Sequence, residues 1–242
     1  MIMFVGAACG KVTIKDVRRM QNMMKDSEQM TCKTVLCYGD SNTYGYDPST
    51  DSRYARNVRW PGRLQLLLGN GYNVIEEGCN GRTTVFDDPE DDWKNGIRYL
   101  KTCLYSHKPL DIMILMLGTN DLKDVFHATP EDIAGGIEEM VKLVRDFTKD
   151  TQGFIPRIIV AAPARIGDGI AKSPFKDSFS EKTVEYSGAL PGLYLKVAER
   201  YGCEFVNAAE YARPSEIDSV HFMPEDHDNL ANAFYNAIMS GK

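Results

Sequence analysis

A continuous apolar run near the middle of the chain constrains the fold more than any other feature. Residues 111–117, with the sequence DIMILML, are bounded by Pro109 and Gly118. A short apolar run of this kind, between two residues that interrupt regular structure, is typical of a strand buried on both faces. Such strands belong to parallel sheets whose two faces are covered by helices. The run therefore predicts an α/β protein.

Strand and helix signals alternate along the chain on both sides of this run. Further strands are predicted at Lys33–Tyr38, Asn73–Glu77, Arg157–Ala162 and Glu204–Val206. Helices are predicted at Trp60–Leu68, Asp92–Leu104, Ser187–Tyr201 and Pro224–Met239, and from near Thr129, a suitable N-cap, to about Thr148. Residues 164–186 show no clear period and are interpreted as a long loop. Strict alternation with right-handed crossovers predicts a three-layer α/β/α domain around a parallel five-stranded sheet.

Composition and charge narrow the range of partners. A chain of 242 residues is long enough for one sizeable α/β domain. No apolar run approaches the roughly 20 residues that a membrane-spanning helix needs. The net charge of −6 is spread along the sequence without a basic block, which argues against nucleic acid or an anionic membrane as a partner. We therefore expect a soluble protein that binds a small molecule.

The spacing of cysteine and histidine indicates neither a disulfide framework nor a metal centre. The six cysteines include no Cys-x-x-Cys pair, and the four histidines lack His-Glu-x-x-His spacing. Buried free thiols, a reducing compartment and the absence of metal and cofactor are therefore predicted. The expected location is the cytoplasm. Export is the alternative, because Met1–Gly10 is apolar and ends in Ala-Ala-Cys-Gly.

The first 31 residues are interpreted as an N-terminal extension in front of a domain that spans residues 32–242. Val17, Met20 and Met24 recur at helical spacing with charges between them, which favours an amphipathic helix. The alternative is that this stretch reflects the choice of start site among several methionines.

Four polar clusters follow the predicted strands. Each has a bland explanation when taken singly, as a turn, a helix cap or a surface ion pair. Together they fall at the carboxyl ends of parallel strands, where α/β sheets bind their ligands. A serine nucleophile needs a base, a group that orients the base and donors for an oxyanion, and the clusters contain candidates for each. The clusters are Gly39-Asp40-Ser41, Glu76–Arg82, Gly118–Asp121 and Asp218–His221.

These clusters and the residues around them resemble the SGNH hydrolases, also called GDSL-type esterases, and within them the arylesterase and acyltransferase branch that includes perhydrolase-type members. The resemblance covers residues 32 to the C-terminus and is weakest in the 164–186 loop. It is carried by Gly39–Gly45 (GDSNTYG), Arg82-Thr83-Thr84, Pro109–Lys123 (PLDIMILMLGTNDLK) and Thr129–Ala134 (TPEDIA). It implies a flavodoxin-like fold and a homo-oligomer.

The resemblance also implies roles for individual residues. Ser41 would be the nucleophile, His221 the general base and Asp218 the acid that orients it. The oxyanion hole would consist of the backbone N–H groups of Ser41 and Gly81 and the side-chain amide of Asn120. Chemistry agrees with these assignments, since a glycine backbone donor approaches a substrate closely and an uncharged amide suits an oxyanion that forms only in the transition state.

The expected function is hydrolysis of short-chain, acetyl-type esters through an acyl-enzyme on Ser41, with transfer of the acyl group to alcohols or peroxide as an additional reaction. The alternatives are a carbohydrate O-deacetylase, a lipid or thioester hydrolase, and a non-catalytic binding module. The substrate pocket is less well defined. Four aromatic residues flank the clusters, and we weigh a place in the pocket against a place in the core for each: Tyr44, Tyr46, Trp60 and Phe222.

Overall fold

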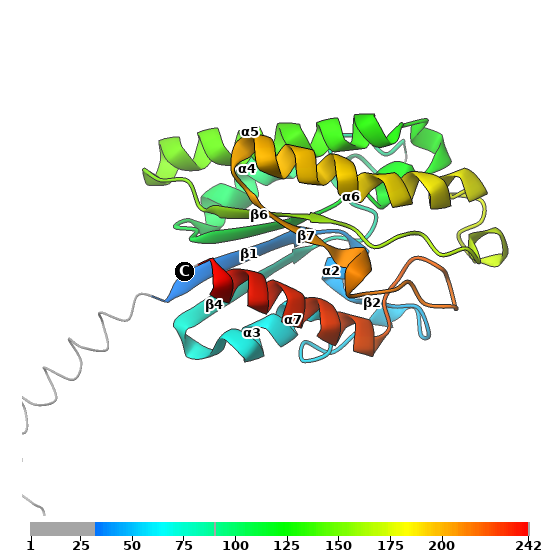
Figure 1. Ribbon diagram of the computed structural model, residues 1–242, viewed down its shortest axis with the longest axis horizontal. Helices are drawn as coiled ribbons and strands as arrows, with labels where there is room; N and C mark the ends of the chain where they lie inside the picture. The colour runs from blue at the N-terminus through cyan, green and yellow to red at the C-terminus, as the bar shows by residue number, and fades with distance from the viewer. Residues whose placement is uncertain (1–31, 90, 242) are drawn as a thin grey trace, which may run out of the picture. The chain divides into compact units, whose positions relative to one another are not determined.

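The computed structural model describes residues 32–89 and 91–241, in which a five-stranded parallel sheet lies between two layers of helices (Figure 1). The strand order is β4-β1-β5-β6-β7, so the chain runs outward from β1 first to one edge and then to the other. This order confirms the predicted doubly wound sheet. The strands are β1 (Lys33–Gly39), β4 (Tyr72–Gly78), β5 (Ile112–Met116), β6 (Arg157–Ala162) and β7 (Glu204–Asn207).

The central strand β5 shows why this sequence forms a two-faced sheet. All five of its residues are buried, and successive side chains point to opposite faces. Met113 and Leu115 belong to the core on one face of the sheet, and Ile114 and Met116 belong to the core on the other face. An apolar run without alternation is therefore what a strand between two cores requires.

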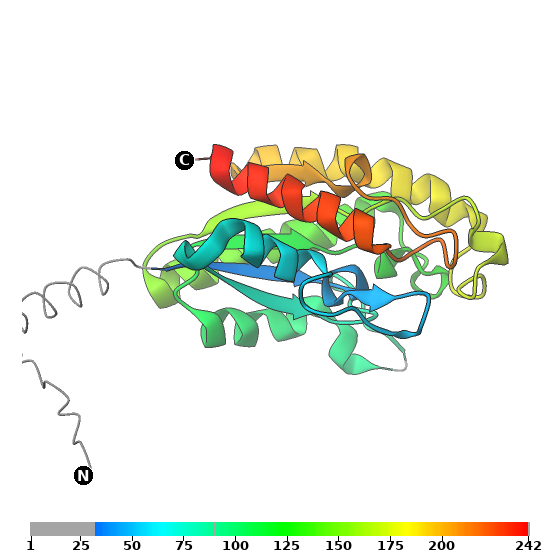
Figure 2. The ribbon, with the colours of Figure 1, turned by 90° about the horizontal axis from the view of Figure 1, so that it is seen from below.

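The helices form one layer on each face of the sheet. Helices α4 (Gly96–His107), α5 (Pro130–Gln152) and α6 (Glu181–Tyr201) cover one face. Helices α3 (Trp60–Leu68) and α7 (Pro224–Ser240) cover the other and lie in front of the sheet in Figure 2. The predicted start of α5 is confirmed by a capping box, in which Thr129 and Asp132 satisfy each other's backbone N–H groups.

Two helices differ from their predicted limits. Helix α6 begins at Glu181, within the segment interpreted as a loop, because residues 181–186 bury Thr183 and pack Val184 and Tyr186 against the core while the charged side chains remain exposed. The helix predicted at Asp92–Leu104 is divided into a 3-10 turn at Asp92–Lys94 and α4, since Asn95 caps the backbone N–H of Arg98. Asparagine favours such caps over helix interiors.

Two short elements after β1 were not predicted. They are helix α2 (Ser41–Tyr44) and a hairpin of β2 (Tyr46–Asp47) with β3 (Ser52–Arg53). Elements of two to four residues are too short to produce a periodic signal.

The helical extension predicted for residues 1–31 lies outside the described residues. Among the described helices, none is long and apolar enough to cross a membrane. The five cysteines of the described ranges are free thiols, as the spacing predicted, but the predicted burial holds only for Cys37 and Cys103, since Cys79 and Cys203 are partly exposed and Cys32 is exposed.

Candidate active site

Ser41 is placed at the carboxyl edge of the sheet by the turn from β1 into α2. The carboxylate of Asp40 caps this short helix by accepting the backbone N–H of Asn42 at 3.0 Å. Gly39 is needed for a close approach, because a Cβ atom at this position would lie 2.1 Å from Oγ1 of Thr43 and 2.8 Å from the carbonyl oxygen of Met116. The turn thus presents the Ser41 hydroxyl, in a residue that is 6% exposed, to the cavity described below.

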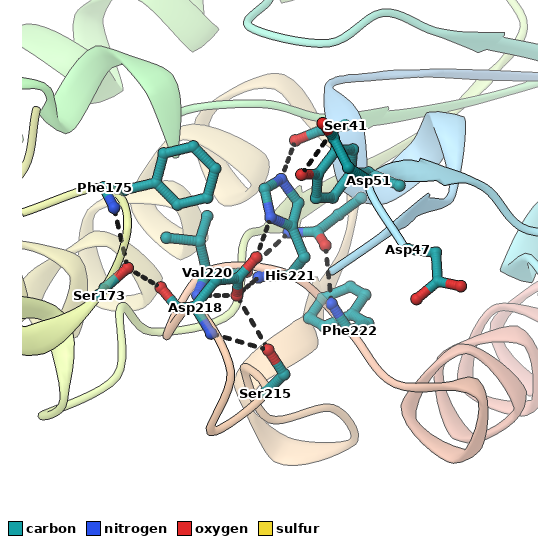
Figure 3. Close-up of polar contacts among 12 residues, drawn as sticks. Ser41, Asp47, Asp51, Ser173, Phe175, Ser215, Asp218, Val220, His221 and Phe222 are labelled. Carbon is teal, nitrogen blue, oxygen red and sulfur yellow. Dashed lines mark hydrogen bonds and ion pairs between the residues drawn. The ribbon is translucent and has the colours of Figure 1, made fainter. Parts of the chain in front are cut away.

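His221 lies between Ser41 and Asp218 (Figure 3). Its Nε2 atom is 2.8 Å from Oγ of Ser41, and its Nδ1 atom is 2.6 Å from Oδ2 of Asp218. A carboxylate at Nδ1 holds the proton on that nitrogen and leaves Nε2 as an acceptor for the serine hydroxyl. The structure therefore brings together the three residues that the sequence placed at opposite ends of the domain.

The second oxygen of the Asp218 carboxylate is fully engaged. Oδ1 accepts hydrogen bonds from the Ser215 hydroxyl and from the backbone N–H groups of Val220 and His221, each at 2.9 Å. Burial alone would raise the pKa of Asp218, but the hydrogen bonds from His221 and from the backbone outweigh it and lower the pKa. The carboxylate therefore remains ionised beside the imidazole at neutral pH.

Asn42 fixes the backbone on both sides of His221. Its Nδ2 donates to the carbonyl oxygen of Val220 at 3.2 Å, and its Oδ1 accepts the N–H of Phe222 at 3.2 Å. The residue next to the serine thus holds the loop that carries the histidine. Sequence reasoning did not identify this role, because an asparagine in a turn has no signal for a partner 178 residues away.

Gly81 and Asn120 approach Ser41 from the two strands that flank β1. Gly81 lies in a turn closed by the hydrogen bond from Arg82 N–H to the Cys79 carbonyl at 3.1 Å. Its φ of +79° lies in the left-handed region that favours glycine, whereas the Lys94 side chain, 2.9 Å from where a Cβ atom would lie, is flexible and could move aside. The Asn120 amide donates one N–H to the Arg82 carbonyl at 3.2 Å, which leaves its other N–H for a ligand. Both residues line the same cavity as Ser41 and His221.

This cavity has a volume of about 290 Å³ and one aromatic side. The ring of Tyr46 lies 4.3 Å from the imidazole of His221, and the ring of Phe175 meets the imidazole at 5.5 Å with an angle of 63°. The Tyr46 hydroxyl donates to Asp51 at 2.9 Å, which holds the ring in place from the tip of the β2–β3 hairpin. Polar residues complete the lining, among them Asn80, Lys123 and Ser178.

Of the four aromatic residues considered for the pocket, Tyr46 lines the cavity. Trp60 and Phe222 are fully buried in the core between the sheet and α7, where the Trp60 ring packs 4.7 Å from Phe234. Tyr44 does not line the cavity, and its ring lies under the guanidinium of Arg53 at 4.2 Å. A place in the core is therefore correct for Trp60 and Phe222, which both belong to the core on the side of the sheet covered by α3 and α7.

A thiol and a possible metal-binding group lie near the site. Burial raises the pKa of Cys79, which makes this thiol a poor alternative nucleophile. Within the described ranges, one group of three residues has ligand atoms within 4.8 Å of one another, namely Glu77, Cys103 and His107. These residues are not part of the cavity lining, and the Glu77 carboxylate is hydrogen-bonded to His107 at 2.8 Å. The chemistry of Ser41 does not involve them.

The doubly wound fold and a serine that contacts a histidine and a carboxylate define the class of a serine hydrolase. Residues 37–230 match the GDSL-like Lipase/Acylhydrolase family. The chain belongs to this family, as the motifs indicated, and is a carboxylic ester hydrolase of the GDSL type.

Similar proteins of known structure include two bacterial esterases. Est24, a carbohydrate acetylesterase from Sinorhizobium meliloti, is 37% identical, with a TM-score of 0.81 over 87% of this chain and 100% of that one. The aryl esterase of M. smegmatis is 34% identical, with a TM-score of 0.81 over 86% and 99%. An acetylxylan esterase from Xylanibacter ruminicola is 26% identical over 72% of this chain, which spans about 35% of the length of that protein.

Proposed function

We propose that this protein is a serine esterase that hydrolyses short-chain, acetyl-type carboxylic esters through an acyl-enzyme on Ser41. The proposal is carried by one observation, the hydrogen-bonded chain from Ser41 Oγ through His221 to Asp218 at the wall of a cavity that also contains Gly81 and Asn120. The distances between these groups support the roles proposed for them.

Acylation begins when Ser41 Oγ attacks the ester carbonyl carbon and its proton passes to Nε2 of His221. The negative charge that develops on the carbonyl oxygen is stabilised by the backbone N–H groups of Ser41 and Gly81 and by the second N–H of the Asn120 amide. Asp218 stabilises the imidazolium and keeps its orientation. When the carbon–oxygen bond breaks, His221 returns the proton to the leaving alcohol, and the acyl group stays on Ser41.

Deacylation repeats these steps with a new nucleophile. His221 takes a proton from water, the resulting hydroxide attacks the acyl carbonyl, and the acid is released as Ser41 recovers its proton. An alcohol or a peroxide that enters the same position gives transfer in place of hydrolysis. The aromatic wall formed by Tyr46 and Phe175 lies against the imidazole and limits how much water surrounds it, which favours partition toward such acceptors.

The size of the cavity supports a short acyl group. Its 290 Å³ is at the lower end of the roughly 300–1,000 Å³ of small-molecule sites and must hold both halves of the ester. The polar part of the lining, with Asp51, Asn80 and Lys123, favours a hydroxylated alcohol half. Deacetylation of carbohydrates is therefore the second candidate, and two similar proteins are named for such activity. A homo-oligomer in the cytoplasm stays a prediction.

A fluorophosphonate probe tests the activated serine. We expect stoichiometric labelling of Ser41 in the wild-type protein and none in Ser41→Ala, located by mass spectrometry of the labelled peptide. Rates on aryl acetate, butyrate and octanoate should fall in that order, and faster turnover of octanoate would contradict a short acyl site. The ratio of acid to new ester, formed from an aryl acetate with added alcohol, measures hydrolysis against transfer.

A further inference from the structure

Arg82 is a buried cation whose charge is balanced only at a distance, by the buried Asp40 carboxylate. The residue is 4% exposed, and its Nε–H has no hydrogen-bond partner. Within the described part of the chain it forms no direct ion pair. The Glu77 carboxylate is hydrogen-bonded to His107 and not to Arg82. A guanidinium is always charged, and burying an unpaired charge is costly. The hydrogen bonds that its donors make to main-chain carbonyls offset this cost.

The guanidinium group bridges the carboxyl ends of two strands that lead to oxyanion donors. Its Nη1 donates to the Gly39 carbonyl at 3.1 Å and to the Glu77 carbonyl. Gly39 ends the strand that leads to Ser41, and Glu77 is near the end of the strand that leads to Gly81. The guanidinium also lies 4.2 Å above the ring of Tyr38 in the core, which fixes its plane.

The backbone of the same residue reaches the remaining donors. Its N–H closes the turn around Gly81 by donating to the Cys79 carbonyl at 3.1 Å. Its carbonyl accepts the Asn120 amide at 3.2 Å and so orients the second N–H of that amide. One residue therefore contacts the end of β1, the turn after β4 and the segment after β5, which lead to or carry Ser41, Gly81 and Asn120.

We propose that Arg82 is the positioning residue of the oxyanion hole: its guanidinium holds the carboxyl ends of β1 and β4 and its backbone holds the Gly81 turn and the Asn120 amide, so that the three donors converge on one point. This inference rests on the esterase function proposed above. Donors must lie about 2.7–3.1 Å from the developing oxyanion to be effective. A misplacement of about 1 Å can lower the rate about 100-fold. The Arg82 side chain therefore acts on the transition state more than on substrate binding.

Arg82→Met removes the guanidinium but leaves the backbone bonds of residue 82 intact. We expect kcat on an aryl acetate to fall about 10- to 100-fold, with KM changed by less than about threefold. The affinity of a boronic acid that forms a tetrahedral adduct with Ser41 should fall by a factor similar to that in kcat. Arg82→Lys, which keeps the charge and one donor direction, should retain more activity than Arg82→Met and serves as the folded variant if Arg82→Met aggregates.

Arg157 provides a matched control at the amino-terminal end of β6, opposite the end of the sheet that carries the site. Its guanidinium binds the Ile238 and Ala237 carbonyls at 3.1 and 3.3 Å and pairs with Glu204, so it also joins separate elements. Arg157→Met should lower the midpoint of thermal unfolding without lowering kcat at a temperature where it is folded. Guanidinium ion at non-denaturing concentration should restore part of the activity of Arg82→Ala. It should leave the activity of Arg157→Ala unchanged.

Two results would overturn the proposal. One is a folded Arg82→Met or Arg82→Lys variant with wild-type kcat and wild-type boronic acid affinity. The other is a loss of activity in both Arg82 and Arg157 variants that follows only the folded fraction. Labelling of wild-type Ser41 by the fluorophosphonate separates these outcomes from a failure of the esterase function itself, because an esterase with an activated Ser41 is labelled and turns over whether or not Arg82 is the residue that positions the donors.

Discussion

At the scale of single residues, the candidate site consists of side chains whose second hydrogen-bonding group is already engaged. Asp218 uses one oxygen for His221 and the other for Ser215 and two backbone N–H groups. Asn120 uses one N–H for the Arg82 carbonyl and keeps the other for the cavity. Groups held in this way need little reorganisation during a reaction, which is the condition for strong transition-state stabilisation.

Asn120→Ala should lower kcat on an aryl acetate by about 10²–10³, which is the usual effect of losing one oxyanion donor. KM should change little, because the donor acts on the charged transition state. Steady-state kinetics with a fluorophosphonate titration of active serines would measure this. Unchanged turnover would remove Asn120 from the oxyanion hole.

The residues of the site differ in how far the sequence indicated them. Ser41, Gly81, Asn120, Asp218 and His221 stand in short motifs after strands, so turn chemistry and the family resemblance both point to them. Phe175 stands in no such motif, and Asn42 stands in the GDSNTYG motif without a role assigned to it. Their roles come from contacts with the histidine loop, and those contacts exist only after the chain has folded.

At the scale of elements, the segment between β6 and α6 acts as a strap across the site. The Ser173 hydroxyl donates to the Asp218 carbonyl oxygen and accepts the N–H of Phe175 at 3.1 Å. Phe175 then meets the imidazole of His221. The buried Ser173 hydroxyl thus joins the loop of Asp218 to Phe175, the aromatic residue beside His221.

Ser173→Ala should lower both stability and activity. It leaves a buried carbonyl and a partly buried N–H without this partner, which costs about 1–3 kcal/mol in free energy of unfolding. We expect a kcat about three- to tenfold lower, since Asp218 keeps its own side-chain bonds. Urea unfolding and kinetics on an aryl acetate would measure the two effects. Wild-type values of both quantities would show that the strap has no influence on the site.

Helices α5 and α6 are joined by a cluster of charges around Glu138. This carboxylate accepts the Tyr201 hydroxyl at 2.7 Å and pairs with Lys142 at 2.9 Å and Arg200 at 2.8 Å. The hydrogen bond from Lys142, followed by that from Tyr201 and the charge of Arg200, lowers the pKa of Glu138 to about 2.

Glu138→Gln should lower the free energy of unfolding by about 1 kcal/mol at neutral pH, because its cationic partners are largely exposed and screened. A carboxyl whose pKa is lower in the folded state stabilises the fold above its unfolded pKa. The difference from the wild type should therefore be constant from pH 6 to 8 and shrink as the pH falls from about 4.5 toward 2. Urea unfolding at several pH values would measure it. A difference that grows on acidification would contradict the assignment.

At the scale of the whole described domain, the sheet separates two cores, and the site lies at one edge of both. Trp60 belongs to the core on the side of α3 and α7, where it is fully buried. Because Trp60 does not line the cavity, we expect a substitution there to change stability and not the shape of the cavity.

Trp60→Ala should lower the free energy of unfolding by about 3–5 kcal/mol, as large-to-small substitutions of buried aromatics do. At a temperature where the variant is folded, its kcat/KM on aryl acetate should stay within about threefold of the wild type. A conservative Trp60→Phe variant, with a smaller loss of stability, is the control. Altered preference among acyl chain lengths in either variant would return Trp60 to the pocket.

The sequence by itself determined the α/β class, the limits of most strands and helices, and the residues at the carboxyl edge of the sheet. These features depend on local properties: a continuous apolar run such as residues 111–117, the cap at Thr129, and the turn chemistry after each strand. Local signals can be read without knowing which segments meet.

Only the tertiary structure decided what surrounds these residues. The pairing of Asn42 with the loop of His221, the strap through Ser173 and the three loops that Arg82 contacts join segments that are distant in the chain. The same holds for the aromatic residues, of which Tyr46 faces the cavity and Trp60 the core. An aromatic side chain is compatible with a core and with the wall of a cavity. Its sequence neighbours therefore do not distinguish the two places, and the packing of the layers does.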